Sequence, residues 1–595
     1  MPIAPIKPKT DWANTELFEG APRISESATN ALFGIRAQEK IRVQPLIPRW
    51  QDIASYINPA MADWGEDSDE SQPQPDFRSL YDMTGPTASS DFADGVQANA
   101  FSRTAPWLRL LMEEERLNEL HEVRLWLQAM DRHCYRQTNQ SNYYTEGRSL
   151  LRTGADFSTA VMLRENNVER GIPSYKNLHL KHCLLMENRW GEVDTLIRDL
   201  WLAPFEAVAE FGIDNVPTRV ADAYRTNKVK KWLFQQFIFP FGKFDLDIDE
   251  KSLRGMPIYS LYTCQQEKRA IRAGGYERRP FWAWRHSRNP DGSPYGGDGP
   301  GYHQLSNVKQ LNGMRRDISR LRQRAAQPPL KATDRLQGRI RLEPNGITFL
   351  KPGEDFTAAL ATGNIEGAWE MVKEVQKEVR TGYHADLFLI FSANIERLKT
   401  ATEAELIQAE QVAMMTSFHG RLSTEYIEPS IEDLVAIELA TGRAPPPPRI
   451  LRDQMIKVDL VSPLAQLQKR YLLLDNTRRF LQEVIALAEI YPEGLDNVDI
   501  NNYLRNAADI YHIDQRVLRN LADVKRIQQG RAVLKAQMLQ QQMQNEQAQA
   551  QAKVYAASTK PAAPGSPAAS RNVAIRRNDR GEMVGAQITE GQGNG

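Results

Sequence analysis

Five glycines lie just before a helix-like stretch and form the first pattern in the sequence that could carry chemistry. They stand at positions 292–301, in PDGSPYGGDGPGYHQL. A glycine-rich turn that leads into a helix can hold a phosphate, because its backbone N–H groups and the helix N-terminus attract anions. The dinucleotide fingerprint GxGxxG would require glycine where Tyr302 stands, no Gly-Lys-Ser/Thr triplet of a P-loop follows, and Pro300 lacks an N–H donor. We therefore interpret these glycines as a turn that lets the chain reverse, and we expect no nucleotide cofactor.

A second pattern, LHLKHC, contains the zinc-ligand types His179, His182 and Cys183. It alternates as a strand does, which would place the two histidines on opposite faces. Only the distant His133 and Cys134 could reach the pattern in three dimensions. We expect no metal here and interpret these side chains as core or surface residues.

The remaining catalytic patterns are missing from the sequence. No GxSxG, HExxH or kinase-type motif occurs. The acidic segment 63–70 lacks a framing helix or strand, and a solvated loop is the simpler interpretation. We therefore expect no catalytic residue and no enzyme.

The composition limits the class of protein. The chain has 595 residues with 75 Lys and Arg against 75 Asp and Glu, so its formal net charge is zero. A protein that clamps nucleic acid non-specifically is usually strongly basic, so any such contact must be local, weak or repeated in an oligomer. Three scattered cysteines predict reduced, intracellular synthesis without disulfides. No apolar run approaches the roughly 18 residues of a membrane span, and the N-terminus lacks a signal peptide.

The helix expected at 303–327, after the glycines, is amphipathic and locally basic. One face of it carries Lys309, Arg316, Arg320 and Arg324, and the whole stretch has six Lys or Arg against one Asp. This cationic face is either a solvated surface or a surface that meets phosphates or an acidic partner. The opposite face is an apolar seam suited to packing on another helix, formed by Leu305, Val308, Leu311, Met314, Ile318 and Leu321.

The other patterns predict an α+β chain that is mainly α with small β insertions. Beyond Met543 the last helix has no apolar face, and its Gln/Ala surface favours a homo-oligomeric helical barrel or coiled coil, with a frayed polar tail as the alternative. The chain after 558 is rich in Pro, Ala and Gly, which predicts disorder. We expect helices at 28–43, 88–101, 111–145, 191–211, 365–382, 400–425, 462–491, 499–511 and 514–555, strands within 155–185, 258–266 and 281–285, and a hairpin at 338–351.

Five stretches in order resemble the portal (head-to-tail connector) proteins of T7-like short-tailed bacteriophages. The resemblance spans about residues 40–535. It departs from the family in an extra Asp298 and Gly301 within the glycine turn, and in the tail beyond about 555. The five stretches are PRWQDIASYINP (48–59), SLYDMTGPTASSDFADGVQANAFSRTAPW (79–107), RPFWAWRHSRNPDGSPYGGDGPGYHQLSNVKQLN (279–312), TATEAEL (400–406) and VDLVSPLAQLQ (458–468).

The resemblance implies a ring, usually of twelve subunits, at one capsid vertex of the virion, after synthesis in the host cytoplasm. Double-stranded DNA would pass through it, and its partners would be the terminase large subunit, the tail adaptor, the major capsid protein and the scaffolding protein. The implied parts are an N-terminal arm (1–30), a wing (31–302), a stem helix (303–327), a clip (328–362), a second stem helix (363–382), a channel segment with more of the wing (383–460), a crown and barrel (461–555) and a disordered tail (556–595).

The same resemblance directs attention to cations that would face the DNA. No catalytic site is implied, because the ATP-driven motor is a separate protein in that family. Two alternatives stay open: a coiled-coil scaffold or tail protein without a channel, and a nucleotide-dependent translocase or nuclease, against which the missing motifs argue. The DNA-channel candidates are Lys309, Arg316, Arg320 and Arg324, with Arg397, Lys399 and Arg421 as candidates for a constriction by position and charge.

Overall fold

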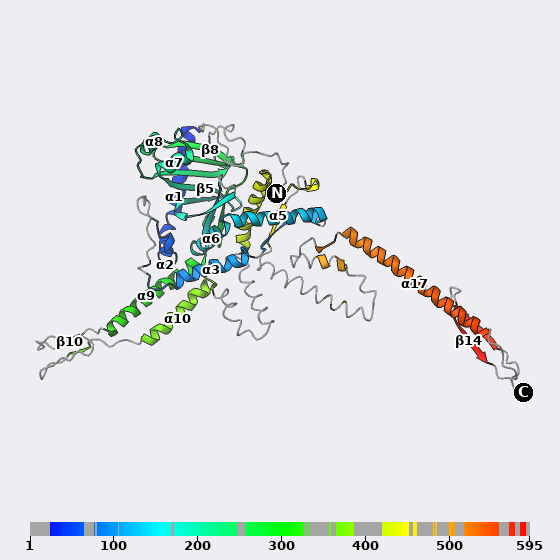
Figure 1. Ribbon diagram of the computed structural model, residues 1–595. Helices are drawn as coiled ribbons and strands as arrows, with labels where there is room; N and C mark the ends of the chain where they lie inside the picture. The colour runs from blue at the N-terminus through cyan, green and yellow to red at the C-terminus, as the bar shows by residue number, and fades with distance from the viewer. Residues whose placement is uncertain are drawn as a thin grey trace. The chain divides into compact units, whose positions relative to one another are not determined.

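The computed structural model divides into two compact units, residues 1–515 and 516–595 (Figure 1). Apart from isolated positions, it describes 24–64, 80–104, 106–118, 120–167, 172–246, 256–326, 330–332, 356–358, 365–385, 419–451 and 456–460 of the first unit, and 517–519, 521–558, 571–577 and 583–590 of the second. The expected clip hairpin at 338–351, the part of the expected helix at 400–425 that precedes residue 419, and the helix at 462–491 lie almost wholly outside these residues.

The N-terminal half of the first unit begins with helices. The first of them starts after Ser25, whose hydroxyl accepts a hydrogen bond from the Ala28 N–H at 3.1 Å. The helix expected at 88–101 starts earlier, at Thr84, because a proline such as Pro86 is tolerated in a first turn. These helices are α1 (Glu26–Val43), α2 (Ile47–Tyr56), α3 (Thr84–Ala100), α5 (His121–Gln140) and α6 (Tyr143–Phe157).

The single helix expected at 111–145 is divided in the structure. Its first residues form strand β1 (Leu108–Met112), which pairs with β12 (Ile456–Leu460) from far along the chain. The short helix α4 (Glu115–Asn118) follows, and α5 begins only at His121. A partner strand nearly 350 residues away is invisible to local periodicity, which explains the error.

Two antiparallel sheets form a larger β portion than the small insertions we expected, although the α+β class is confirmed. The prediction of a helix at 191–211 is wrong for its first half. That stretch forms a central strand that pairs with a strand on each side, and the helix begins only at Pro204. One sheet has the order β3-β2-β9 and the other β4-β5-β6-β7-β8. The strands are β2 (Thr159–Asn167), β3 (Ile172–Leu178), β4 (Cys183–Glu187), β5 (Val193–Leu202), β6 (Trp232–Pro240), β7 (Ile258–Cys264), β8 (Arg269–Tyr276) and β9 (Phe281–Arg285), and α7 (Pro204–Phe211) and α8 (Thr218–Arg225) connect β5 to β6.

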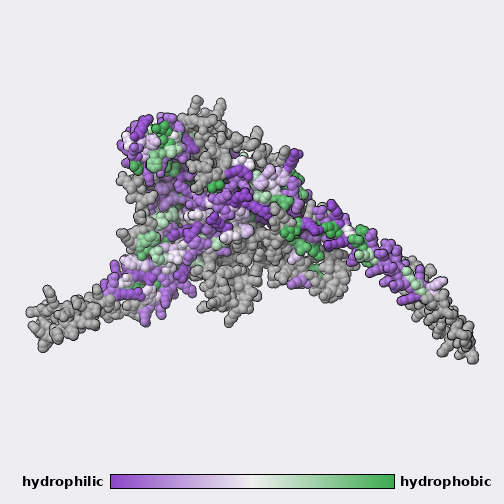
Figure 2. Space-filling model, in the orientation of Figure 1, coloured by the Kyte–Doolittle hydropathy of each residue, from purple (hydrophilic) through white to green (hydrophobic). Residues whose placement is uncertain are grey.

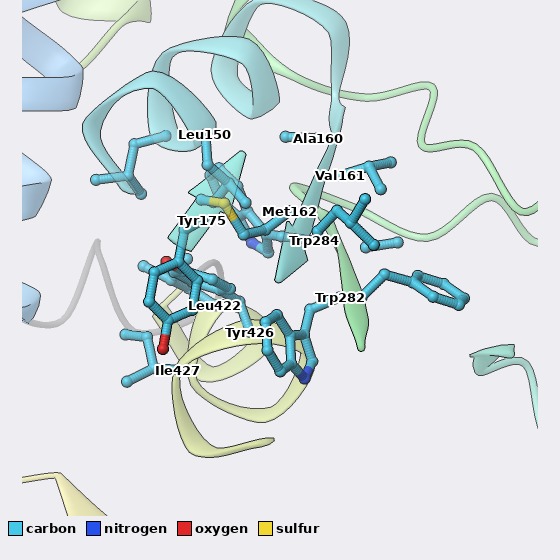
Figure 3. Packing of buried hydrophobic residues seen from close by; sticks show 14 of the residues in the cluster. Leu150, Ala160, Val161, Met162, Tyr175, Trp282, Trp284, Leu422, Tyr426 and Ile427 are labelled. Carbon is cyan, nitrogen blue, oxygen red and sulfur yellow. The ribbon is translucent and has the colours of Figure 1, made fainter. Parts of the chain in front are cut away.

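The main core joins these helices to the three-stranded sheet through buried aromatic rings. Tyr143 is stacked between Trp107 and Tyr426, with ring centroids 6.1 and 5.8 Å away. Figure 3 shows Trp282 of β9 in the same cluster as Tyr426, which lies in the π-helix η4 (Ser423–Ile427). Helix α13 (Glu428–Ala440) continues directly from η4. The core therefore draws on residues more than 300 positions apart.

Two long helices leave this core as a pair. They are α9 (Pro300–Ala326) and α10 (Ile365–Gly382), which lie side by side (Figure 1). The bounds expected for the second helix are confirmed, and the first begins three residues earlier than expected. Between them the structure describes only the paired short strands β10 (Leu330–Ala332) and β11 (Phe356–Ala358).

The second unit contains one long helix, α17 (Leu521–Ser558), and a β-hairpin of β13 (Arg571–Arg577) and β14 (Met583–Glu590). This hairpin differs from the disorder that composition predicts for 556–595. The antiparallel pairing of the two strands satisfies their backbone N–H and C=O groups. None of the helices described has the length and apolarity to cross a membrane.

Candidate nucleic-acid interface

The glycine turn between β9 and α9 is a packed joint. A Cβ atom on Gly301 would lie 2.1 Å from the carbonyl oxygen of Asp156, and one on Gly296 would lie 2.5 Å from that of Ser158. The Gly296 N–H also donates to the Thr159 hydroxyl at 2.8 Å. These glycines therefore allow the turn to touch the backbone at the end of α6, which is a reason for glycine that has nothing to do with a phosphate.

The residue that breaks the dinucleotide fingerprint has a structural role of its own. Tyr302 is buried, and its hydroxyl accepts a hydrogen bond from the Trp50 indole N–H at 2.7 Å. The guanidinium of Arg49 lies over its ring, 4.7 Å from the centroid. Tyr302 thus fastens the first turn of α9 to α2.

A buried carboxylate connects the base of both helices to the core. Asp156 of α6 accepts hydrogen bonds from the Asn58 amide at 2.9 Å and from the Tyr383 hydroxyl at 3.1 Å. Burial raises the pKa of Asp156 to about 6, in spite of Arg152 and these donors. Because Gly301 packs on its backbone and Tyr383 directly follows α10, this one residue positions the start of α9 and the end of α10. The sequence did not predict this role of Asp156, because a single Asp within a helix does not indicate a buried contact.

A second buried carboxylate holds the pair further along. Asp82, just before α3, accepts hydrogen bonds from the Arg315 guanidinium at 3.1 Å and from the Gln376 amide at 2.9 Å. It therefore bridges α9 and α10 through a single side chain. Asp82 lies in SLYDMTGP, within one of the stretches that carry the portal resemblance. The sequence therefore drew attention to this segment, but it did not indicate which residues Asp82 contacts.

The facing sides of α9 and α10 form a small core of their own. Leu311 and Ile318 of α9 are buried against Val372 of α10, which confirms the predicted seam. The guanidinium groups of Arg315 and Arg322 lie over the Trp369 ring, each 4.7 Å from its centroid. Arg315 and Arg322 thus serve the helix pair, which agrees with their absence from the cationic face predicted from the sequence.

The predicted channel cations fall into different surroundings. Lys309 is bound to α2, with its ammonium 2.7 Å from the Asp52 carboxylate and 5.4 Å from the Tyr56 ring centroid. Arg316, Arg320 and Arg324 form an exposed row spaced four residues apart on the side of α9 away from α10. We call these three residues the basic row.

The basic row has little internal compensation. The Arg316 and Arg320 guanidinium groups lie only 3.6 and 3.9 Å from the Asp317 carboxylate, and their side chains are 46% and 61% exposed. Figure 2 shows mainly hydrophilic residues on the visible side of the helix pair. The row is therefore a solvated cationic surface available to an external anion.

The other channel candidates are not part of this row. Arg421 is half-buried in the helical turn that continues into η4, so the structure places it on a separate element. Arg397 and Lys399 lie outside the described residues.

The element that carries Arg421 is joined to the sheets by a buried ionic network. Arg285, the last residue of β9, donates from Nε to Glu425 at 3.1 Å and from its backbone N–H to the same carboxylate at 2.8 Å. Its guanidinium also pairs with Glu187 of β4 and donates to the Gly191 carbonyl at 2.9 Å. The network connects both sheets to η4.

The LHLKHC segment folds differently from the single strand we expected. A 3-10 turn, η2 (Leu180–His182), interrupts it and brings the His179 and His182 rings to a centroid distance of 5.9 Å. The His179 Nδ1 accepts a hydrogen bond from the Lys181 N–H at 3.1 Å, and burial lowers the pKa of His179 to about 4. Within the described part of the chain, no group of three His, Cys, Asp or Glu residues is arranged to hold a metal ion.

Comparison with known proteins defines the class of this chain. The family model of the bacteriophage head to tail connecting protein matches residues 34–518, so the chain belongs to that family of phage structural proteins. It is 25% identical over 523 residues to the portal protein of Salmonella phage epsilon15, covering 86% of this chain and 92% of that protein. It is also 25% identical over 487 residues to the probable portal protein of Bordetella phage BPP-1, covering 79% and 85%. The resemblance that the five sequence stretches indicated is confirmed.

Proposed function

We propose that this chain is the subunit of a portal ring at one capsid vertex, through which double-stranded DNA is packaged, retained and ejected. The observation that carries the proposal is the match to the head-to-tail connector family over residues 34–518. The ring would have about twelve subunits by analogy with that family. It would dock the terminase large subunit and then the tail adaptor, and would contact the major capsid and scaffolding proteins.

The α9–α10 pair is the part we assign to the stem around the channel. A stem helix must be long, must be fixed at its base and must present a surface that duplex DNA can pass. The pair has these properties: Asp156 and Asp82 hold it to the core, and its outer surface is polar. We assign 31–302 and part of 383–460 to the wing, 328–362 to the clip and 461–555 to the crown and barrel.

The basic row is the surface we assign to passing phosphates. A conduit must not hold many phosphates at once, because each additional ion pair with DNA strengthens binding and slows sliding. A neutral chain in which at most the three arginines of the basic row are open to DNA in each subunit meets this requirement. Lys309, which pairs with Asp52, contributes less in this proposal, and Arg397, Lys399 and Arg421 are the candidates for a constriction that retains DNA.

Imaging of the purified full-length protein by negative-stain electron microscopy tests the proposal. We expect rings with a central hole wide enough for a DNA duplex. Rods or monomers would instead favour a coiled-coil scaffold or tail protein without a channel. Robust ATP turnover by the purified protein would contradict the assignment as a passive conduit.

A further inference from the structure

The outer face of α10 carries a row of acidic residues that the portal assignment does not explain. Glu366, Glu370, Glu374 and Glu378 are exposed and spaced four residues apart, so they form one stripe along the helix. Of these, Glu378 accepts a 3.5 Å hydrogen bond from the Asn307 amide. Among the described residues the other three have no ion-pair partner. We call the four residues the acidic row.

The basic and acidic rows point to opposite sides of the helix pair. The inner faces of the two helices are packed on each other through Leu311, Ile318 and Val372. The basic row lies opposite this seam on α9, and the acidic row lies opposite it on α10. The two rows therefore cannot meet within one subunit.

The two rows nevertheless lie at the same level along the axis of the helix pair. The two helices run antiparallel, because Gly382 at the end of α10 packs on Gln304 near the start of α9, and Asn307 contacts Glu378. Arg316 lies nine residues beyond Asn307 along α9, and Glu370 lies eight residues before Glu378 along α10. With a rise of about 1.5 Å per residue, Arg316 is level with Glu370 to within about 2 Å.

The same reasoning applies one turn further on. Arg320 lies thirteen residues beyond Asn307, and Glu366 lies twelve residues before Glu378, so these two are also level. In a closed ring each subunit presents one side to the next at the same height, and the two sides are different surfaces. Where the two helices of each pair lie side by side around the circumference of the ring, neighbouring pairs bring a basic row beside an acidic row.

We infer that the basic row of one subunit binds the acidic row of the next copy of this chain, with Arg316 against Glu370 and Arg320 against Glu366. The inference rests on the proposed ring and adds the contact that joins its stems. Lys373 and Lys377 border the acidic row, so the match depends on which edge of α10 faces the neighbour.

This contact would also leave a defined remainder of the basic row for DNA. Arg324 lies four residues beyond the level of Glu366, the first described acidic residue of α10. Two of the three arginines in the row would be neutralised by the neighbour, and Arg324 would stay open to phosphates. A channel that exposes fewer free cations lets the duplex slide more easily.

Charge reversal in the full-length protein tests the contact. One variant combines Arg316→Glu with Arg320→Glu, a second combines Glu366→Arg with Glu370→Arg, and a third carries all four changes. Native mass spectrometry over a dilution series measures the concentration at which half of the protein is in rings. We expect each of the first two variants to raise this concentration at least about tenfold, which corresponds to about 1.4 kcal/mol. The third variant should return to within about threefold of the wild type.

The matched control is Arg324→Glu, which reverses a charge of the same row outside the contact and should leave assembly unchanged. The pair Arg316→Gln with Arg320→Gln should weaken assembly in the same direction but less strongly, and it avoids introducing a repulsive charge that could disturb folding. Circular dichroism confirms that the helices are intact in each variant.

Two results would overturn the inference. The rows do not meet if neither double charge reversal weakens ring assembly. The same conclusion follows if the variant with all four changes assembles no better than the two double variants. Wild-type rings would still form in either case, so the proposed function would stand. A wild-type chain that forms no rings would instead contradict the proposed function itself.

Discussion

The sheet-and-helix core of the first unit and the α9–α10 pair are held together by different means. In the core, aromatic rings such as Tyr143 and Trp107 are fully buried and stacked. In the helix pair, Leu311, Ile318 and Val372 form only a small buried cluster, and guanidinium groups lie over the Trp369 ring. The core is thus packed largely through its own buried side chains, whereas the pair relies more on its anchors at Asp156 and Asp82 and, in our inference, on neighbouring subunits.

This contrast fits the physical demands on the two regions. A long helix gains most of its stability from packing an apolar face, and a seam only a few residues wide provides little. In the proposed ring, a more apolar outer surface would hinder the passage of DNA, a charged polymer. The predictions below measure how far the two regions differ.

The largest effect is expected from Arg285→Met, which removes the cation of the buried network in the core. Glu187 is buried and would keep only its longer 3.6 Å contact with Arg288, and Glu425, which is 20% exposed, would lose this partner. Breaking a buried ion pair typically costs about 3–5 kcal/mol. Chemical unfolding followed by circular dichroism measures the change. The control is Arg225→Met, because Arg225 pairs with Asp222 at the surface with both side chains more than 60% exposed, and little change is expected. Equal effects of the two substitutions would refute the view that the core depends on buried contacts.

The second effect is expected at the joint between the two regions. Gly301→Ala would place a methyl group against the Asp156 backbone, which must move or displace α9, at a cost of about 3 kcal/mol. Gly313→Ala is the matched control, since nothing lies within 4 Å of its added Cβ in the middle of the same helix. We expect it to stabilise the protein by about 0.5–1 kcal/mol. Thermal unfolding of the two variants should therefore shift in opposite directions.

A pH-dependent effect on stability is expected in the core at Asp131 of α5. Burial raises the pKa of Asp131 to about 7, while its carboxylate accepts a 2.9 Å hydrogen bond from the Leu110 N–H. The folded state thus holds a proton that the unfolded chain releases above pH 4, so this residue lowers stability as the pH rises from about 4 to 7. The free energy of unfolding of the Asp131→Asn variant, relative to that of the wild type, should rise by about 2 kcal/mol as the pH increases from 5 to 7.5. Denaturant titrations at each pH measure this difference. Parallel pH profiles of the two proteins would contradict a dry environment around α5.

The smallest effect should be confined to the helix pair. Trp369→Ala removes the ring between Arg315 and Arg322, and we expect a loss of about 1–2 kcal/mol that is felt locally. Hydrogen–deuterium exchange should accelerate in α9 and α10 and stay unchanged in the sheets. Met371→Ala, at an exposed position of the same helix, is the control and should alter neither region. Faster exchange in the sheets after Trp369→Ala would mean that the two regions unfold together.

Much of the helix pair could be predicted from the sequence. The apolar seam from Leu305 to Ile318 repeats with the helical period, and such periodicity is a local property of the chain. The bounds 365–382 and the short strand at Phe281 were recognised for the same reason. The family resemblance likewise depended on stretches of sequence in order, and the family model confirms it.

The strand at Val193 and the strand at Leu108 could not be predicted in this way. Each is defined by hydrogen bonds to partners elsewhere in the chain, and in the case of Leu108 the partner is Leu460. A short apolar run fits a helix or a strand equally well until such a partner is known. The same limit applies to Arg285 and Glu425, whose types are ordinary and whose pairing requires the fold.

By itself the sequence determined the family, the absence of known catalytic motifs and the existence of a basic amphipathic helix after the glycine turn. Only the tertiary structure decided that Gly301 is needed for contact with Asp156, that Lys309 is bound to Asp52, and that Arg316 and Arg320 remain exposed. The physical reason is that residue type and spacing define which side chains share a helix face. What that face meets depends on chain segments hundreds of residues away.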